Sequence, residues 1–348
     1  MIVRVNENDF ERYEDFVSAH PFGHFMQSLR WAKFKNNQRS YAIMSVDDSG
    51  EIVGTMLVFV QNVRRTKKKI LYCPRGPVCS REDVSVLDEL ICEARKIADE
   101  VGAYKLTMDP DITDADCCWL DFLQKKGAVI GENDLDNSIL QPFSVYRINV
   151  DKDDDSLMES YHSKARYSVR VAIKSEATCR VGDKEDIPVF CSLLESTATR
   201  DGFTPRKEEY FYNMLDALGE DFFKIFIVEC EGEPIAGSVL LKYGKKTWHM
   251  YAGSNDKFKE TLPNFLMQWE MMRWSRDNGC DIYDMRGIAG EGDKLTPIEG
   301  LVRFKKRFGG ELCSFVGRID IVYNKFSDSY VKTLKKVARL IRRKKGMR

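Results

Sequence analysis

The fold is decided by the six residues IVGTML at positions 52–57, because a closely similar word, IAGSVL, returns at positions 235–240. The two words match position by position in size and polarity. Each lies in the second strand of an expected hairpin, and the four strands are Tyr41–Val46 with Ile52–Val60, and Phe223–Cys230 with Ile235–Leu241. A repeated order of elements indicates an internal duplication.

Each hairpin is followed by the same order of elements: a strand, a long helix and a second strand. The expected elements are Ile70–Tyr72, a helix from about Arg81 to Val101 and Ala103–Met108 in the first copy, and Trp248–Tyr251, a helix from about Pro263 to Asp277 and Cys280–Met285 in the second. Ser80, three residues before Asp83, predicts a capping box at the first helix, and Pro263 suits the first turn of the second. This order is the core of the acetyltransferase-like (GNAT-like) α/β fold. We therefore expect two tandem domains of that kind, the alternative being two unrelated α+β domains.

Composition excludes several classes of protein. With 348 residues, 43% of them apolar and 31% charged, the chain fits a globular protein of two domains. Its start lacks the apolar run of a signal peptide and no stretch approaches a membrane span, so we expect a cytoplasmic location. The ten cysteines are scattered without a Cys-x-x-Cys pair and the four histidines lack metal-ligand spacing, so no metal is expected. The formal net charge of zero allows only a local basic patch.

An acyl-CoA enzyme of this fold holds the pyrophosphate on consecutive backbone amides at the start of the long helix, which favours a glycine-rich stretch there. The first helix start reads GPVCS at 76–80, where Pro77 removes an amide donor. The second reads KFKETLP at 257–263 and has no glycine. An acyl-CoA-dependent N-acyltransferase is therefore the weaker hypothesis and remains the alternative.

Seven short words occur in an order that points to one family. They are Gln27–Trp31 with Lys35, Pro74–Pro77, Lys164–Arg166 with Arg170, Arg200–Phe203, Tyr251–Ser254, Tyr283–Asp284 with Gly287, and Phe304–Lys305 with Phe308–Gly310. Together they resemble the Fem family (FemABX), the transferases that build peptidoglycan cross-bridges from aminoacyl-tRNA. Staphylococcal members insert a coiled-coil arm in the second domain, but residues 200–210 show no sustained heptad here. The chain thus resembles the short, armless members, which act as monomers.

The resemblance implies a domain division and a reaction. The first domain would comprise residues 1–150 and the returning segment 317–348, and the second residues 151–316. The enzyme would move glycine, alanine or serine from aminoacyl-tRNA to the side-chain amine of the stem peptide in a peptidoglycan precursor, without a cofactor. The precursor would be lipid II or UDP-MurNAc-pentapeptide, and the sequence does not choose between them.

The resemblance also implies catalytic residues. A lysine amine, with an ordinary pKa of about 10.4, must lose a proton before it attacks an ester, and the resulting oxyanion must be stabilised. Asp109 matches a family position where a carboxylate orients or deprotonates the amine, although Asp109-Pro110 is equally a turn signal. Lys305 matches the position that faces the oxyanion, and its alternative is a solvated lysine in the basic run 303–307. Phe304 is expected to hold Lys305 by apolar packing or a cation–π contact.

The diphosphate of the precursor requires fixed cations and hydroxyl donors. The residues at the family's phosphate-holding positions are Lys35, Arg206, Tyr210 and Tyr251. Arg206 and Tyr210 are four apart, so they would share one side of a helix that begins near Pro205. The alternative for both tyrosines is a core aromatic with a satisfied hydroxyl. Tyr104 is expected to line the same substrate site.

The end of the chain predicts a basic amphipathic helix. From Tyr330 onward it lacks acidic residues, Val331, Leu334, Val337 and Ile341 share one helical face, and the cations are Lys332, Lys335, Lys336, Arg339, Arg342, Arg343, Lys344, Lys345 and Arg348. Such a helix contacts either tRNA phosphates or the anionic inner membrane leaflet, or it packs as a closing helix with a solvated basic face. A protein that binds tRNA or lipid without catalysis is thus a third class to test.

Overall fold

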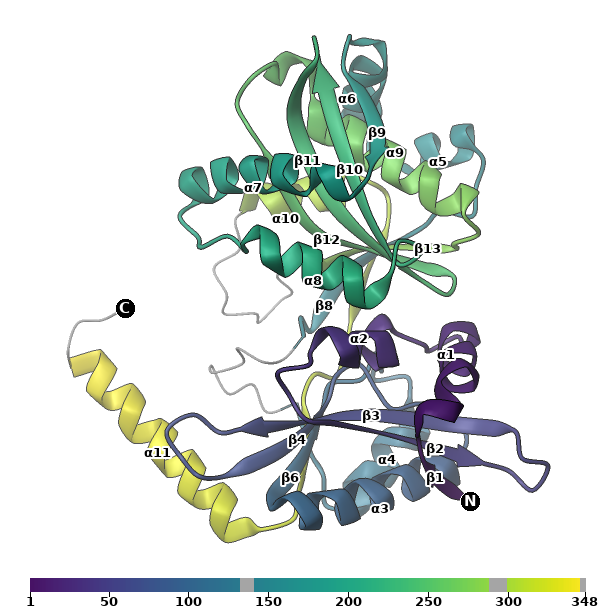
Figure 1. Ribbon diagram of the computed structural model, residues 1–348, viewed down its shortest axis with the longest axis vertical. Helices are drawn as coiled ribbons and strands as arrows, with labels where there is room; N and C mark the ends of the chain where they lie inside the picture. The colour runs from purple at the N-terminus through teal and green to yellow at the C-terminus, as the bar shows by residue number, and fades with distance from the viewer. Residues whose placement is uncertain (132–140, 288–298, 345–348) are drawn as a thin grey trace. The chain divides into compact units, whose positions relative to one another are not determined.

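A computed structural model describes residues 1–131, 141–287 and 299–344 (Figure 1). The chain forms two compact units, Met1–Gln141 with Phe315–Arg348, and Pro142–Ser314. The first boundary falls earlier than the expected residue 150. The reason is strand β8 (Ser144–Asn149), which pairs with β13 and β14 and so belongs to the sheet of the second unit.

The first unit is a mixed sheet in the strand order β1-β2-β3-β4-β6-β15-β7, with β5 paired to β3. Its strands are β1 (Ile2–Arg4), β2 (Ser40–Val46), β3 (Ile52–Asn62), β4 (Lys69–Cys73), β5 (Val78–Cys79), β6 (Ala103–Met108), β7 (Val129–Ile130) and β15 (Ile319–Val322). Its helices are α1 (Phe10–Ala19), α2 (Leu29–Phe34), α3 (Val84–Val101), α4 (Cys117–Lys125) and α11 (Lys325–Lys344). Strand β15 pairs antiparallel with β6, so the C-terminal segment completes this sheet.

The long helix α3 packs the core of the first unit against the sheet. Its apolar stripe, including Leu87, Leu90 and Ala94, is fully buried against strands β2 to β6. The expected capping box at Ser80 is wrong. The helix begins at Val84, and the Asp83 side chain accepts hydrogen bonds from the amides of the first turn, because a carboxylate one residue before the helix satisfies those donors directly.

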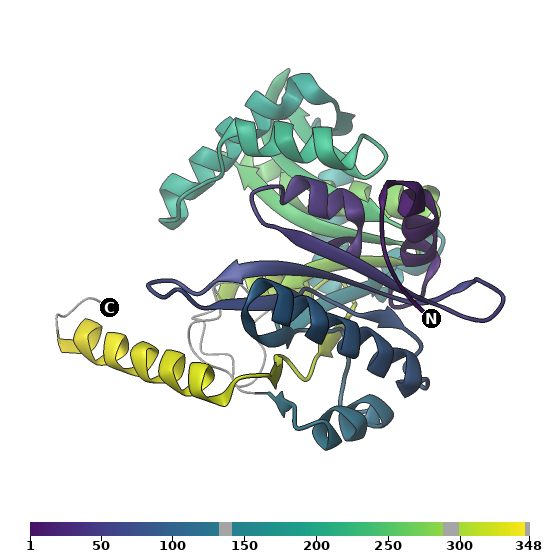
Figure 2. The same cartoon turned by 60° about the horizontal axis from the view of Figure 1, so that its bottom comes forward.

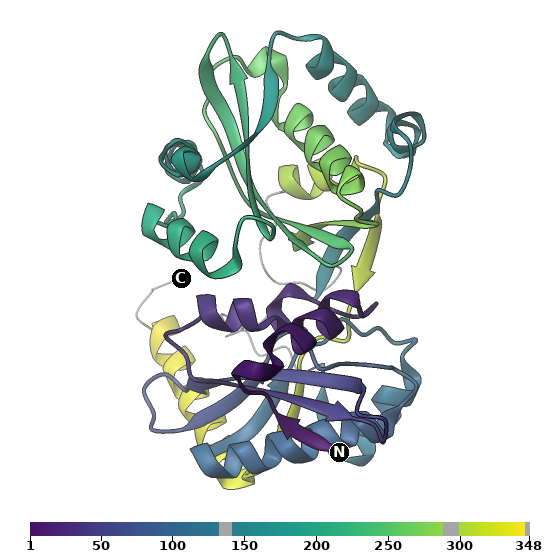
Figure 3. The same cartoon turned by 45° about the vertical axis from the view of Figure 1, so that its right-hand side comes forward.

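The second unit is a sheet in the order β14-β8-β13-β12-β11-β10-β9. Besides β8, its strands are β9 (Thr178–Gly182), β10 (Phe223–Cys230), β11 (Glu233–Tyr243), β12 (Lys246–Ser254), β13 (Ile282–Gly287) and β14 (Glu311–Ser314). Its helices are α5 (Asp154–Ser160), α6 (Ser163–Lys174), α7 (Ile187–Asp201), α8 (Glu208–Leu218), α9 (Pro263–Asp277) and α10 (Glu299–Lys306). Helix α9 covers one face of the sheet, while α7 and α8 cover the other (Figure 3).

The two units repeat one arrangement, β2-β3-β4-α3-β6 and β10-β11-β12-α9-β13, in which a hairpin leads to a parallel strand pair joined by the long helix. The repeated words lie in the equivalent strands β3 and β11 but one residue out of register. Each strand holds one extra residue, Val53 or Ile235, so Gly54 corresponds to Ala236 rather than to Gly237. A shift of one residue reverses the face of a strand. Accordingly, Gly54 lies against α3, whereas Gly237 lies against α7.

The close approach of α7 to β12 generates a testable prediction. A Cβ atom added at Gly253 would lie 2.4 Å from the Leu194 amide nitrogen, so Gly253→Ala must push backbone against backbone. We expect a loss of about 1–3 kcal/mol in the free energy of unfolding, measured by urea titration. The control is Gly300→Ala in α10, where no atom lies within 4 Å and stability should stay the same or rise slightly. Equal stability of the two variants would contradict the packing.

Candidate functional site

The parallel strand pair of the first unit stays together to its end. Strands β4 and β6 pair as far as Cys73 and Met108, the last residue of each. Asp109 follows at once and is only 1% exposed. Its carboxylate accepts hydrogen bonds from the Tyr72 hydroxyl at 2.7 Å and from the backbone amides of Arg75 at 2.9 Å and Gln141 at 2.8 Å, the first two being on or just after β4.

These contacts favour the structural interpretation of Asp109 over the general-base one. Burial raises the pKa of Asp109, while the positive charge of Arg75 and the three donors oppose that rise. A carboxylate enclosed by three donors of its own fold ties the end of β6 to the end of β4. The word Pro74–Pro77 gains a structural explanation as well, because Gly76 lies directly against the buried Gln27 side chain.

The equivalent pair of the second unit separates. Strands β12 and β13 pair from Lys246 and Ile282 only as far as Trp248 and Asp284 in the described register, although β12 continues to Ser254 and β13 to Gly287. Two local irregularities accompany the separation. Met250 is an extra residue in β12 opposite β11, and Arg286 in β13 has a φ of 63°.

Lys305, on helix α10, binds the end of β13 at this separation. Its ammonium donates hydrogen bonds to the carbonyl oxygens of Met285 at 2.6 Å and Gly287 at 2.7 Å, and the residue is 6% exposed. Burial lowers the pKa of Lys305 to about 8, against the opposing charge of Asp284 and with a further lowering by Arg286. Lys305 is therefore not the solvated lysine of the alternative interpretation. Two carbonyls orient its ammonium, and its third N–H has no hydrogen-bond partner among the described residues.

Of the two ways in which Phe304 was expected to hold Lys305, the described residues show apolar packing and no cation–π contact. Its ring packs edge-on against Phe265 and Phe308, with ring centres 5.1 Å apart in both pairs. These contacts join α10 to the apolar core beneath α9. Phe304 therefore positions the helix that carries Lys305, while the carbonyls of β13 position the ammonium itself.

A group of polar residues that the sequence does not single out lies near Lys305. The half-buried His249 of β12 stacks on Tyr283 with ring centres 6.5 Å apart, and the Gln268 amide nitrogen lies 3.5 Å from its ring nitrogens. The Tyr283 hydroxyl donates to the Gln268 side-chain oxygen at 2.8 Å. Burial, and next the charge of Lys305, lower the pKa of His249 to about 3, so its imidazole is neutral at neutral pH. In the sequence, the spacing of the four histidines bears only on metal binding, for which it is wrong, and gives no sign of this stacking.

Three of the expected phosphate-binding residues do come together in the second unit. The Tyr210 and Tyr251 hydroxyls are hydrogen bonded at 2.9 Å, and the exposed Arg206 guanidinium lies 5.0 Å from the Tyr210 ring centre. Helix α8 begins at Glu208, so the expectation of a helix from near Pro205 is wrong and Arg206 lies just before it. Burial, then Tyr251, raises the pKa of Tyr210, which keeps that hydroxyl a donor. The group joins one cation to two hydroxyls.

The other two expected binding residues belong to the first unit and have different neighbours. Lys35 ends α2, with its ammonium 4.9 Å from the Trp31 ring centre and 4.5 Å from that of Phe34. Tyr104 is 5% exposed and packs with Ile70 and Val331, under helix α11. This packing gives Tyr104 a place in the fold and does not support the expected contact with substrate.

The described residues contain no helix that has both the length and the apolar character to span a membrane. Among the same residues, no three His, Cys, Asp or Glu side chains are grouped so that they could hold a metal ion.

Comparison with known proteins covers nearly the whole chain. The FemAB family model matches residues 9–231 and 222–336. A UDP-N-acetylmuramoylpentapeptide-lysine N(6)-alanyltransferase from Weissella viridescens is 32% identical over 332 residues, which cover 91% of this chain and 96% of the relative. A lipid II:glycine glycyltransferase from Staphylococcus aureus (strain bovine RF122 / ET3-1) is 28% identical over 389 residues, covering 90% and 91%.

Solved structures agree with these relatives. The crystal structure of FemX matches with a TM-score of 0.87 at 25% identity and covers 93% of this chain and 98% of that one. A tandem GNAT protein from the clavulanic acid biosynthesis pathway matches with a TM-score of 0.54 at 10% identity, covering 93% and 98%, which is a likeness of fold. The expected pair of acetyltransferase-like domains is thereby confirmed. No arm is inserted between α7, which ends at Asp201, and α8, which begins at Glu208. The chain belongs to the FemAB family, in its short form without the coiled-coil arm.

Proposed function

We propose that this aminoacyltransferase moves glycine, alanine or serine from aminoacyl-tRNA to the side-chain amine of a peptidoglycan stem peptide. The observation that carries the proposal is the buried Lys305 ammonium, held by two carbonyls where β12 and β13 separate, in a FemAB protein. The relatives are named for two acceptors, UDP-N-acetylmuramoylpentapeptide and lipid II. Either precursor therefore remains a candidate acceptor for this chain.

The reaction is aminolysis of an ester. The neutral amine attacks the ester carbonyl, a C–N bond forms, and the carbonyl oxygen becomes an oxyanion. When the oxyanion collapses, the C–O bond to the ribose breaks, and the proton that the attacking nitrogen loses passes to the ribose oxygen, which leaves as the tRNA hydroxyl. A fixed ammonium interacts more strongly with the oxyanion of the transition state than with the carbonyl oxygen of the ground state. We assign this role to Lys305, positioned by β13 and by Phe304.

The remaining expected site residues receive different roles. The exposed Arg206, with Tyr210 and Tyr251, supplies a cation and two hydroxyls for the precursor diphosphate. Lys35, in the first unit, stays a proposed phosphate-binding residue on the family resemblance. Asp109 is assigned a positioning role and not that of general base, because its carboxylate already binds three donors of the fold.

Acyl-CoA remains the less favoured hypothesis for the donor, and the local structure at both long helices adds a reason. The Asp83 carboxylate caps the first amides of α3, so an anionic pyrophosphate would meet a negative charge there. At α9, Pro263 occupies the first turn and contributes no amide donor. These features support aminoacyl-tRNA as the co-substrate without a separate cofactor.

The test offers radiolabelled donors to purified protein with each precursor. Label should pass from charged tRNA to UDP-MurNAc-pentapeptide or lipid II, and none should pass from acetyl-CoA. Acetyl transfer in place of aminoacyl transfer would establish the alternative function. Tight tRNA binding without transfer from either donor would indicate a binding protein instead.

We further propose a cytoplasmic location and a monomeric enzyme, with peripheral contact at the membrane.

Removing the Arg206 cation should weaken precursor binding. Arg206 is exposed, so Arg206→Ala removes charge-assisted hydrogen bonds to phosphate without disturbing the core. We expect a loss of roughly tenfold or more in affinity for UDP-MurNAc-pentapeptide by calorimetry. The control is Lys207→Ala, which removes an adjacent exposed charge. The same affinity in both variants at moderate salt would exclude this phosphate site.

Removing the Lys305 cation should slow the chemical step. Loss of one oxyanion donor costs on the order of 100- to 1,000-fold in other enzymes, so Lys305→Met should lose a similar factor in single turnover with precursor affinity nearly unchanged. Phe304→Ala should be impaired in the same step. The control is Lys306→Met, because Lys306 is the exposed neighbour. Equal losses at 305 and 306, or a loss confined to tRNA affinity, would reassign Lys305 to phosphate binding, provided that unfolding curves show Lys305→Met to be folded.

A further inference from the structure

Helix α11 leaves its main apolar face uncovered. Six apolar side chains fall within an arc of about 120° at the usual helical repeat. Their exposed fractions run from 37% at Leu334 to 91% at Phe326. The members of this arc are Phe326, Tyr330, Leu334, Val337, Leu340 and Ile341. A contiguous apolar row of this size is characteristic of a surface that binds something.

The fold itself uses a different side of the helix. Val331, expected on one face with Leu334, Val337 and Ile341, is 4% exposed, whereas those three are 37–50% exposed, so that expectation is wrong for Val331. Val331 packs with Ile70 and Tyr104, and Val63 packs against the same cluster. Beyond these first turns α11 extends away from the sheet of the first unit (Figure 2). Attachment through Val331 therefore fixes the helix without covering the arc, and the closing-helix interpretation does not account for the uncovered row.

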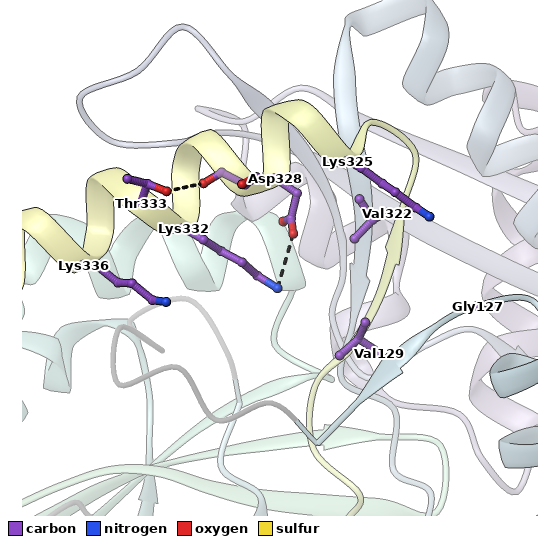
Figure 4. Close-up of a pocket in the computed structure, with 9 residues that line it drawn as sticks. Gly127, Val129, Val322, Lys325, Asp328, Lys332, Thr333 and Lys336 are labelled. Atoms are coloured by element: carbon purple, nitrogen blue, oxygen red, sulfur yellow. Dashed lines mark hydrogen bonds and ion pairs between the residues drawn. The ribbon is translucent and has the colours of Figure 1, made fainter.

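Lysines flank the arc on one side. Lys325, Lys332 and Lys336 fall within about 40° of one another on the helix. Figure 4 shows all three projecting from the same side of α11, where they line a hollow with Val322 and Val129. Lys332 also pairs with Asp328 at 3.3 Å, which orients its ammonium.

A basic loop flanks the arc on the other side. Arg65, Lys67 and Lys68, in the loop between β3 and β4, line a second hollow together with Tyr330 of the arc. Val63, at the base of this loop, packs against the cluster that holds Val331. The loop and the helix are thus tied together, and the apolar row lies between two groups of positive charge.

We propose that α11 and the β3–β4 loop bind the surface of an anionic lipid bilayer. The arc would enter the boundary between headgroups and acyl chains, and the flanking cations would contact anionic headgroups. RNA phosphates would use the cations but give the aliphatic side chains no partner. A second copy of the chain, paired through the same face, would bring the two lysine flanks together. The charge pattern therefore favours the bilayer, and the inference stands independently of the proposed transfer reaction.

The test measures binding of the full chain to sedimented vesicles. Vesicles containing phosphatidylglycerol should bind more tightly than vesicles of phosphatidylcholine alone, and salt should weaken the difference. Val337→Asn with Ile341→Asn, two exposed positions, should reduce binding at least tenfold. Arg65→Gln with Lys67→Gln should reduce it about fivefold per charge, on the anionic vesicles alone. The matched control is Lys125→Gln with Lys174→Gln, which removes two exposed charges elsewhere.

Other occupants give different results. Unchanged vesicle binding by the asparagine variant overturns the proposal. The proposal is also overturned if only the glutamine variant loses vesicle binding and its binding to uncharged tRNA falls by the same factor, because that result identifies an RNA-binding surface. A concentration-dependent dimer that the asparagine variant abolishes identifies a second copy. Thermal unfolding curves of both variants should match that of the unaltered chain, which shows that they fold and keeps this test separate from that of the transfer reaction.

Discussion

The parallel strands β12 and β13 stay paired for three residues and then separate, and the proposed chemistry depends on that separation. In the first unit the equivalent strands, β4 and β6, remain paired to their ends, and the Asp109 carboxylate ties them. In the second unit the Lys305 ammonium binds the carbonyls of the separated strand. The same arrangement therefore ends in a buried anion in one copy and a buried cation in the other. Only the cation matches the charge that develops in ester aminolysis.

Local patterns were sufficient to predict much of the fold. The bounds of β6, β10 and α9 follow from alternation, turn residues and Pro263, all of which act within a few positions along the chain. The register of the duplication could not be predicted from these patterns. One extra residue in each hairpin determines which face of the sheet Gly54 and Gly237 occupy, and the two six-residue words do not show where that residue lies. The capping error at Ser80 arose because the sequence offers two acceptors near the helix start. The Ser80 hydroxyl accepts from the Glu82 amide before α3, whereas the Asp83 carboxylate accepts from the first-turn amides of Ser85 and Val86.

The site was predictable only where family words carried it. Tyr210, Tyr251 and Arg206 do come together. The position of the Lys305 ammonium depends on carbonyls about twenty positions earlier in the chain, and the basic run around Lys305 gives no sign of that contact. Tyr104 was expected beside the substrate, yet its ring packs with Val331, more than two hundred positions later. Nothing in the sequence around His249 predicted its contacts with Tyr283 and Gln268, apart from its place two residues before Tyr251. Contacts this distant in sequence leave no local pattern.

The most direct test of the central claim is the pH dependence of the single-turnover rate. The pKa of Lys305 is lowered to about 8, so its charged form is present below that pH and is lost as the pH rises through it. An oxyanion donor must be charged, whereas the attacking amine, with a pKa of about 10.4, must be neutral, so above about pH 8 the loss of charged Lys305 offsets the gain in neutral amine. The rate should therefore rise up to about pH 8 and then stay level. The slow residual reaction of Lys305→Met should lack this levelling and keep rising above pH 8. A native rate that keeps rising well beyond pH 8 would contradict the account.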